Sequence, residues 1–134
     1  MRKSFTLLEM LIVVAILAIL ATFAIPQYLT AIERTKMSKA RANLKLILDA
    51  EVMYRAENNS YLAVNEGESF DATFLGDYVE LVDIDNDEYW TYRTVVIGNI
   101  VYILATRTSG RYVNKILYIS SNGNCYTTHP LGGC

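Results

Sequence analysis

The sequence contains few of the residues that usually carry chemistry. Its 134 residues include a single histidine, His129, and only two cysteines, Cys125 and Cys134. There is no glycine-rich phosphate loop and no paired cysteine or histidine motif of the kind that holds zinc. Nothing marks a nucleophile beside His129, so a histidine-based catalytic triad is not supported. We therefore expect a protein that is not an enzyme and that holds no metal and no cofactor.

Breaks in the chain are also scarce in the first part of the sequence. Residues 1–57 contain no glycine and one proline, Pro26. This predicts a continuous helix from Phe5 to about Glu57, on the order of 80 Å long at 1.5 Å per residue. Pro26 has no N–H for the carbonyl of Thr22, and we expect it to kink the helix there.

Charge is missing from the 23 residues Met10 to Ile32. A bilayer core needs roughly 20 mostly apolar residues in a helix, so this run is long enough to span it. We expect residues 5–32 to be an apolar half of the helix, buried in lipid or among copies of itself. Glu9 lies at the edge of this half, and an unpaired carboxylate buried there would cost several kcal/mol, roughly, so it calls for a partner.

Residues 33–134 have the pattern of a small globular domain. Apolar residues continue at helical spacing through Leu48, and an acidic, polar stretch follows over residues 58–88, with a short helical turn expected near Thr73–Tyr78. Successive hairpins are then predicted, with strands at Tyr89–Ile97, Ile100–Arg107, Tyr112–Ser120 and Cys125–Thr128. The fold class is α+β: one long helix with a small antiparallel sheet packed on its C-terminal half.

Charges are segregated along the chain. Residues 33–45 carry a net charge of +4, residues 46–88 one of −11, and residues 89–134 one of +4. This segregation could attract subunits to one another in register, or it could mark solvated faces. Residues 83–88 could form a calcium loop, but they lack the glycine and the terminal glutamate of an EF-hand, which favours a solvated turn. No basic and aromatic interleaving indicates nucleic acid.

The two cysteines lie at the end of the sequence. In an oxidising compartment Cys125 and Cys134 would form a disulfide, worth about 2–3 kcal/mol on the chain-entropy model. The alternatives are free thiols or half of a metal site, and the second has only His129 nearby. The disulfide is the preferred interpretation.

The N-terminus resembles the class III signal of the type IV pilin superfamily. The resemblance rests on Arg2-Lys3-Ser4 followed by FTLLEMLIV, with Pro26-Gln27-Tyr28 at the family's distance, and extends loosely through EVMY…NNSY at residues 51–61. It implies that residues 1–4 are a leader. It further implies that a membrane-embedded aspartyl peptidase cuts between Ser4 and Phe5 and methylates the new amine of Phe5. Ser4 stands where the family has glycine.

The resemblance also implies partners and a location. Glu9 would pair with the Phe5 amine of a neighbouring subunit in a helical homo-oligomeric filament. The partners would be the prepilin peptidase, the pilus assembly platform and, before assembly, the bacterial inner membrane. The precursor would lie in that membrane and the product in an extracellular surface filament. More Lys and Arg follow the apolar run than precede it, which predicts the C-terminus inside, whereas the motif and the cysteines favour outside.

Three alternatives to a type IV pilus subunit stay open. The first is a pseudopilin of a type II secretion or competence system. The second is a soluble secreted binding domain with an ordinary signal peptide cut after Ala24, although Glu9 inside the apolar region argues against it. The third is a single-pass anchor that does not assemble.

Overall fold

The long helix α1 spans Leu7–Asn58 in the computed structural model, which describes residues 4–132 and residue 134. Its 52 residues include Pro26, and the helix continues through that position. It ends where Asn59 takes a left-handed conformation, with φ of 58°, and donates its N–H to the carbonyl of Arg55 at 2.8 Å. The helix expected between Phe5 and about Glu57 is therefore confirmed to within two residues at each end.

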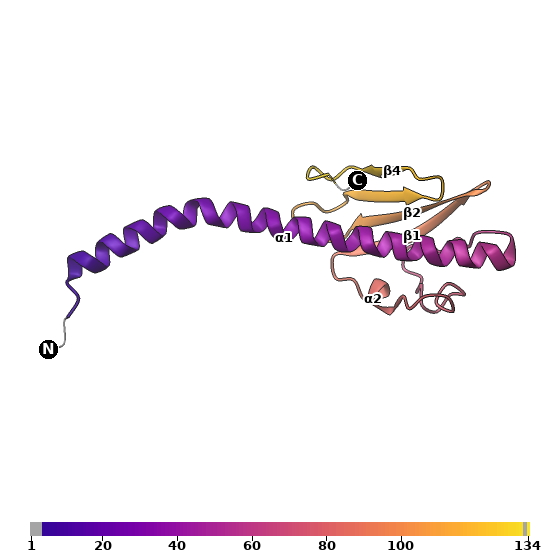
Figure 1. Ribbon diagram of the computed structural model, residues 1–134, viewed down its shortest axis with the longest axis horizontal. Coiled ribbons are helices and arrows are strands. Elements are labelled where there is room, and N and C mark those ends of the chain that lie inside the picture. The colour runs from indigo at the N-terminus through magenta and orange to yellow at the C-terminus, as the bar shows by residue number, and fades with distance from the viewer. Residues whose placement is uncertain (1–3, 133) are drawn as a thin grey trace. The chain divides into compact units, whose positions relative to one another are not determined.

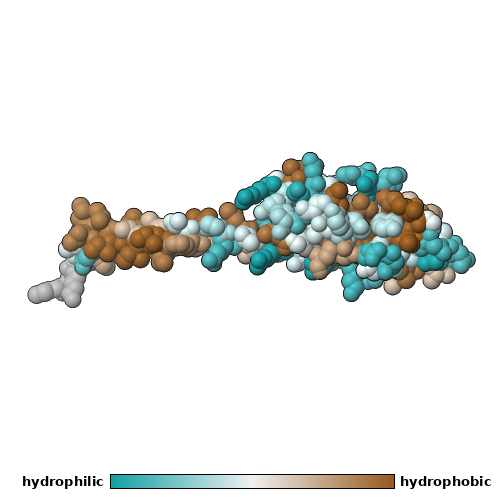
Figure 2. Space-filling model, turned by 90° about the horizontal axis from the view of Figure 1, so that it is seen from above, coloured by the Kyte–Doolittle hydropathy of each residue, from teal (hydrophilic) through white to brown (hydrophobic). Residues whose placement is uncertain are grey.

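The chain divides into two compact units, Met1–Thr35 and Lys36–Cys134. In the first unit, an 18-residue window of α1 reaches a mean hydropathy of 2.7, and none of it is buried. Figure 2 shows this stretch as an almost unbroken brown, hydrophobic surface. By length and composition this part of α1 can cross a membrane, a property that signal sequences share. Nothing in the described part of the chain covers its apolar surface.

The second unit contains a four-stranded antiparallel sheet in the order β1-β2-β3-β4. The strands are β1 (Trp90–Ile97), β2 (Ile100–Arg107), β3 (Ile116–Ser120) and β4 (Cys125–Thr127). A two-residue loop joins β1 to β2, and Gly98 has the positive φ of 59° that a type II′ turn requires at its first position. The predicted meander is confirmed, except that β3 starts at Ile116 because turns occupy residues 110–115.

One face of the sheet packs against the C-terminal half of α1 (Figure 1). Burial alternates along β2, as it must when one face of a strand is covered and the other is exposed. Two small residues of this core, Ala40 on α1 and Ala105 on β2, are completely buried. The core they share consists of Met37, Ala40, Leu44, Ile47 and Ala50 from α1 and Trp90, Tyr92, Val101, Ile103, Ala105 and Leu117 from the sheet. The predicted α+β architecture is confirmed.

The connection between α1 and β1 is folded onto this core. Val64, Phe70, Leu75, Leu81 and Ile84 are all buried. A four-residue helix, α2, forms at Val82–Asp85, whereas the helical turn expected at residues 73–78 is a series of turns. The turns bring the backbone so close to itself that a Cβ on Gly76 would lie 2.2 Å from the carbonyl oxygen of Asp71, so this position requires glycine. One of these turns is closed by the N–H of Val79, which donates to the carbonyl of Leu75 at 3.4 Å, whereas α2, in which Ile84 is buried, was not predicted.

A buried carboxyl ties the end of α1 to the start of this connection. Glu51 has no exposed surface, and its Oε2 accepts the N–H of Leu62 at 2.9 Å. Thr94 on β1 bonds the same segment, since its Oγ1 donates to the carbonyl of Leu62 at 2.8 Å and accepts the N–H of Val64 at 2.7 Å. Burial raises the pKa of Glu51 from 4.5 to about 7, although the bond from Leu62 acts in the opposite direction.

Candidate processing and assembly site

The first turn of α1 is closed by a capping box. Thr6 precedes the helix and Glu9 is its third residue. The N–H and the Oγ1 of Thr6 donate to Oε2 of Glu9 at 2.8 and 2.9 Å, and the N–H of Glu9 donates to Oγ1 of Thr6 at 3.2 Å. This satisfies two N–H groups that a helix start otherwise leaves without partners. The pattern Thr-x-x-Glu at residues 6–9 could have predicted this cap, and our sequence reading missed it.

The cap gives the carboxylate of Glu9 hydrogen-bond partners within its own chain. In the single chain its carboxylate is exposed and has partners, so it carries no local penalty there. Both bonds from Thr6 use Oε2, and Oε1 has no hydrogen-bond partner among the residues that the structure describes. A negative charge therefore stands at the rim of the apolar stretch, with one oxygen held and the other available.

The expected cleavage position lies just outside the helix. Ser4 and Phe5 are exposed and precede α1, and Phe5 has 76% of its surface accessible. An exposed peptide outside regular structure is the kind of segment that a peptidase can bind. Phe5 and Glu9 line one shallow hollow with Met10, Ile12 and Val13. The structure thus brings Phe5 and Glu9 together, whereas Arg2 and Lys3 of the predicted leader lie outside the described residues.

Pro26 lies well inside α1. It cannot donate an N–H to the carbonyl of Thr22, which a residue at that position normally does. Two hydroxyls bond the backbone nearby: Thr22 Oγ1 donates to the carbonyl of Ala18 at 2.9 Å, and Thr30 Oγ1 to that of Pro26 at 3.0 Å. Such bonds often accompany a bend. The kink at Pro26 stays a prediction.

Cys125 and Cys134 form a disulfide, as expected, with their Cα atoms 5.8 Å apart. Cys125 opens β4, so the bond ties the last residue to the edge of the sheet. The histidine in the closed loop, His129, is buried, and its ring lies 4.4 Å from that of Tyr112. Its Nδ1 accepts the N–H of Leu131 at 3.2 Å. His129 therefore packs the loop onto the domain.

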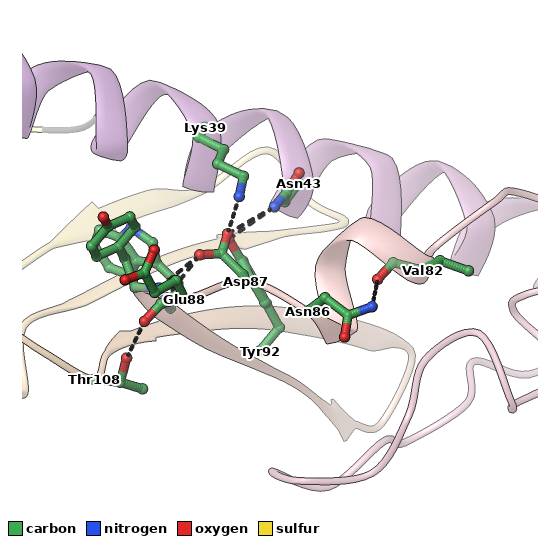
Figure 3. Close-up of polar contacts among 10 residues, drawn as sticks. Lys39, Asn43, Val82, Asn86, Asp87, Glu88, Tyr92 and Thr108 are labelled. Carbon is green, nitrogen blue, oxygen red and sulfur yellow. Dashed lines mark hydrogen bonds and ion pairs between the residues drawn. The ribbon is translucent and has the colours of Figure 1, made fainter.

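Asp87 joins α1 to the start of β1 (Figure 3). Its side chain is fully buried, and its Oδ2 lies 3.2 Å from Nζ of Lys39. The same oxygen accepts the amide of Asn43 at 3.3 Å and the hydroxyl of Tyr92 at 3.0 Å. Its Oδ1 accepts the N–H groups of Tyr89 and Trp90 at 2.9 and 3.2 Å. Burial and the neighbouring Asp87 charge raise the pKa of the Tyr92 hydroxyl above its ordinary range.

Asp85 also folds the acidic segment. Its carboxylate accepts the N–H groups of Phe70 and Asp71 at 2.7 and 3.0 Å. The solvated turn predicted for residues 83–88 is therefore wrong for Asp87, whose charge is buried and paired, because the sequence could not show that Lys39 lies beside it. Among the described residues, no three His, Cys, Asp or Glu side chains are placed to hold a metal ion.

Comparison with known proteins supports the resemblance of the N-terminus. The family described as the prokaryotic N-terminal methylation motif matches residues 1–25. The chain is 42% identical over 60 residues to the type IV major pilin protein PilA of Myxococcus xanthus, covering 45% of this chain and 27% of that protein. It is 46% identical over 59 residues to the type IV wide pilus major component PilA4 of Thermus thermophilus, covering 44% and 45%.

Secretion proteins also match. The chain is 35% identical over 66 residues to the type II secretion system core protein G of Pseudomonas aeruginosa, covering 49% of this chain and 46% of that protein. The chain thus spans less than half the length of each of these relatives, and no solved structure matches it significantly. The resemblance to the type IV pilin superfamily is confirmed, and the relatives include pilins as well as secretion proteins.

Proposed function

We propose that this chain is a structural subunit of a type IV pilus, without catalytic activity, that polymerises through its apolar N-terminal helix after its leader is removed. The observation that carries the proposal is the methylation motif over residues 1–25, which coincides with an exposed apolar stretch that begins with the Thr6–Glu9 cap. Residues 1–4 would be the leader, residues 5–32 the membrane and filament-core half of the helix, and residues 33–134 the globular domain.

Cleavage would create the positive charge that Glu9 requires. Before cleavage the nitrogen of Phe5 is a neutral amide. Hydrolysis of the Ser4–Phe5 peptide bond turns it into an amine, which is protonated at neutral pH because α-amino groups titrate near about 8, and methylation by the prepilin peptidase keeps that charge. Processing would therefore supply a cation four residues from the carboxylate.

The new amine of one subunit would then bind Glu9 of another. Thr6 holds Oε2 of Glu9 from within the same chain, which leaves Oε1 for the neighbour's ammonium group. A buried carboxylate is tolerated when a buried cation meets it and the remaining lone pairs accept hydrogen bonds. The pair would set the axial register of each incoming subunit, and its absence in the uncleaved precursor would prevent premature assembly.

The apolar stretch would serve in two environments. In the precursor it would span the inner membrane, and in the filament it would pack among identical helices after transfer by the assembly platform. Removing a stretch with no cover in the chain from water is strongly favourable in either case, because each buried CH₂ contributes about 0.8 kcal/mol. The globular domain would lie outside the cell, where the disulfide can form.

A pseudopilin of a secretion or competence system is the second candidate, because type II secretion core proteins G are among the relatives. The disulfide-closed C-terminal loop supports the pilus, since it resembles the corresponding region of pilins. The acidic segment supports it too, because Asp85 and Asp87 are already engaged by donors of the chain itself. A calcium requirement for folding would favour the pseudopilin.

The test is electron microscopy of filaments sheared from cells that express the chain, with mass spectrometry of their subunit. The expected subunit begins at N-methylated Phe5. A soluble product that begins at Ile25 would show an ordinary signal peptide, and a membrane protein that still begins at Met1 would show an anchor. Loss of protein secretion on deletion, with no surface filaments from the wild type, would identify a pseudopilin.

A further inference from the structure

An exposed side of α1 in the second unit carries two cations. Arg41 and Lys45 are exposed and one helical turn apart, to one side of the face that buries Ala40, Leu44 and Ile47. Neither cation has an ion-pair partner among the residues that the structure describes. Like charges at this spacing slightly destabilise a helix, so the pair does not stabilise α1.

Three exposed acids carry the opposite charge. Asp77, Glu80 and Asp83 lie in the connection before β1, and none forms an ion pair within the described part of the chain. They differ in this from Asp85 and Asp87, which fold that connection through hydrogen bonds to the backbone and to Lys39. Their charges are therefore not needed to hold the fold together.

We propose that the α1 face carrying Arg41 and Lys45 docks on segment 77–83 of a neighbouring copy of this chain. The inference rests on the proposed filament, in which identical chains supply both charged surfaces in equal number. The same face of α1 continues to Val52, seven residues after Lys45, whose surface is 51% exposed. Docking would bury this apolar surface away from water, which is favourable.

Zero-length carbodiimide cross-linking of sheared wild-type filaments tests the contact directly. The reagent joins a lysine amine to a carboxylate only when the two are close enough to form an ion pair. We expect a covalent dimer in which the ε-amine of Lys45 is linked to Asp77, Glu80 or Asp83, identified by mass spectrometry. Lys45 and these acids form no ion pair within one chain, so the dimer band identifies the link as one between subunits.

Charge exchange tests whether the contact supports assembly. Like charges brought together at an interface repel one another, so the variant R41E/K45E should yield at least about tenfold fewer filaments. Adding D77K/E80K/D83K to that variant should restore them. The matched control is R93E/R111E, which changes the net charge equally at two exposed positions, one on β1 and one in the connection between β2 and β3, and which should assemble normally.

The outcomes separate this inference from the proposed function. If wild-type cells produce no filaments, the proposed function fails first. If wild-type filaments form but Lys45 is linked only to other acids, or R41E/K45E assembles like the wild type, the proposed contact is refuted. Because cross-linking uses the unchanged protein, poor folding of a variant cannot hide the cross-linking result.

Discussion

The buried carboxyl of Glu51 allows the stability of the globular unit to be predicted from one substitution. Glu51 has no exposed surface, and its pKa is about 7 against an ordinary value of 4.5. The folded protein therefore keeps this proton at pH values where the unfolded chain has lost it. Between these two pKa values the unfolded state binds fewer protons, so stability falls as the pH rises from about 4.5 to about 7 and then levels off.

The size of the loss follows from the shift. A pKa unit corresponds to about 1.4 kcal/mol, so a change from 4.5 to about 7 costs about 3 kcal/mol at pH 8. Glutamine has nearly the same shape, keeps an oxygen to accept the Leu62 N–H, and cannot ionise. The variant E51Q should therefore match the wild type near pH 4.5 and be more stable by up to about 3 kcal/mol at pH 8.

The assay is urea unfolding of the full chain in mild detergent, followed by fluorescence of Trp90. Trp90 is the only tryptophan, and it is buried in the same core, with 1% of its surface exposed. The control E80Q removes an exposed carboxylate and should change stability little at either pH. Equal effects of E51Q at both pH values, or a less stable E51Q at pH 8, would refute the reasoning.

Three further results are expected. E9A should remain in the membrane at the wild-type level but yield far fewer sheared filaments than L11A, a neighbouring truncation that keeps the charge; equal yields would contradict the pairing role of Glu9. D87A should unfold about 2–3 kcal/mol more easily than the wild type in the urea assay, because it leaves buried donors without a partner, whereas D83A should stay within about 0.5 kcal/mol. C134S should cost about 2–3 kcal/mol in the same assay, and an unchanged midpoint under non-reducing conditions would argue against a stabilising disulfide.

Local patterns predicted most of the elements in this chain. The two-residue turn at Gly98-Asn99 sets the β1–β2 register, so β2 was predicted at its observed ends. The start of β3 was predicted four residues too early, since Tyr112 and Val113 have strand propensity but lie in turns. Propensity describes single residues, whereas Asn114 adopts a positive φ of 64° that ends any strand there.

In the candidate site, too, some features can be predicted from local sequence and others depend on the tertiary structure. Phe5, Glu9 and the basic leader form a pattern of adjacent residues, and a pattern of adjacent residues can be read without coordinates. The Thr6–Glu9 cap is equally local, and it could have been predicted from its four-residue pattern, Thr-x-x-Glu. Asp87 could not, because Lys39 and Asn43 precede it by more than 40 residues and only the packing of α1 on the sheet brings them together.

The sequence by itself determined the apolar run, its single carboxylate and the order of helix and strands, since periodicity and local spacing specify each of them. Only the tertiary structure decided which charges are available. Asp85, Asp87 and Glu51 look like surface acids in the sequence, but contacts with distant segments engage all three. Arg41, Lys45, Asp77, Glu80 and Asp83 are left exposed. The physical reason is that a charged side chain is paired or stays exposed according to which groups the tertiary fold places near it. Those groups come from distant parts of the sequence, so composition and local spacing cannot identify them.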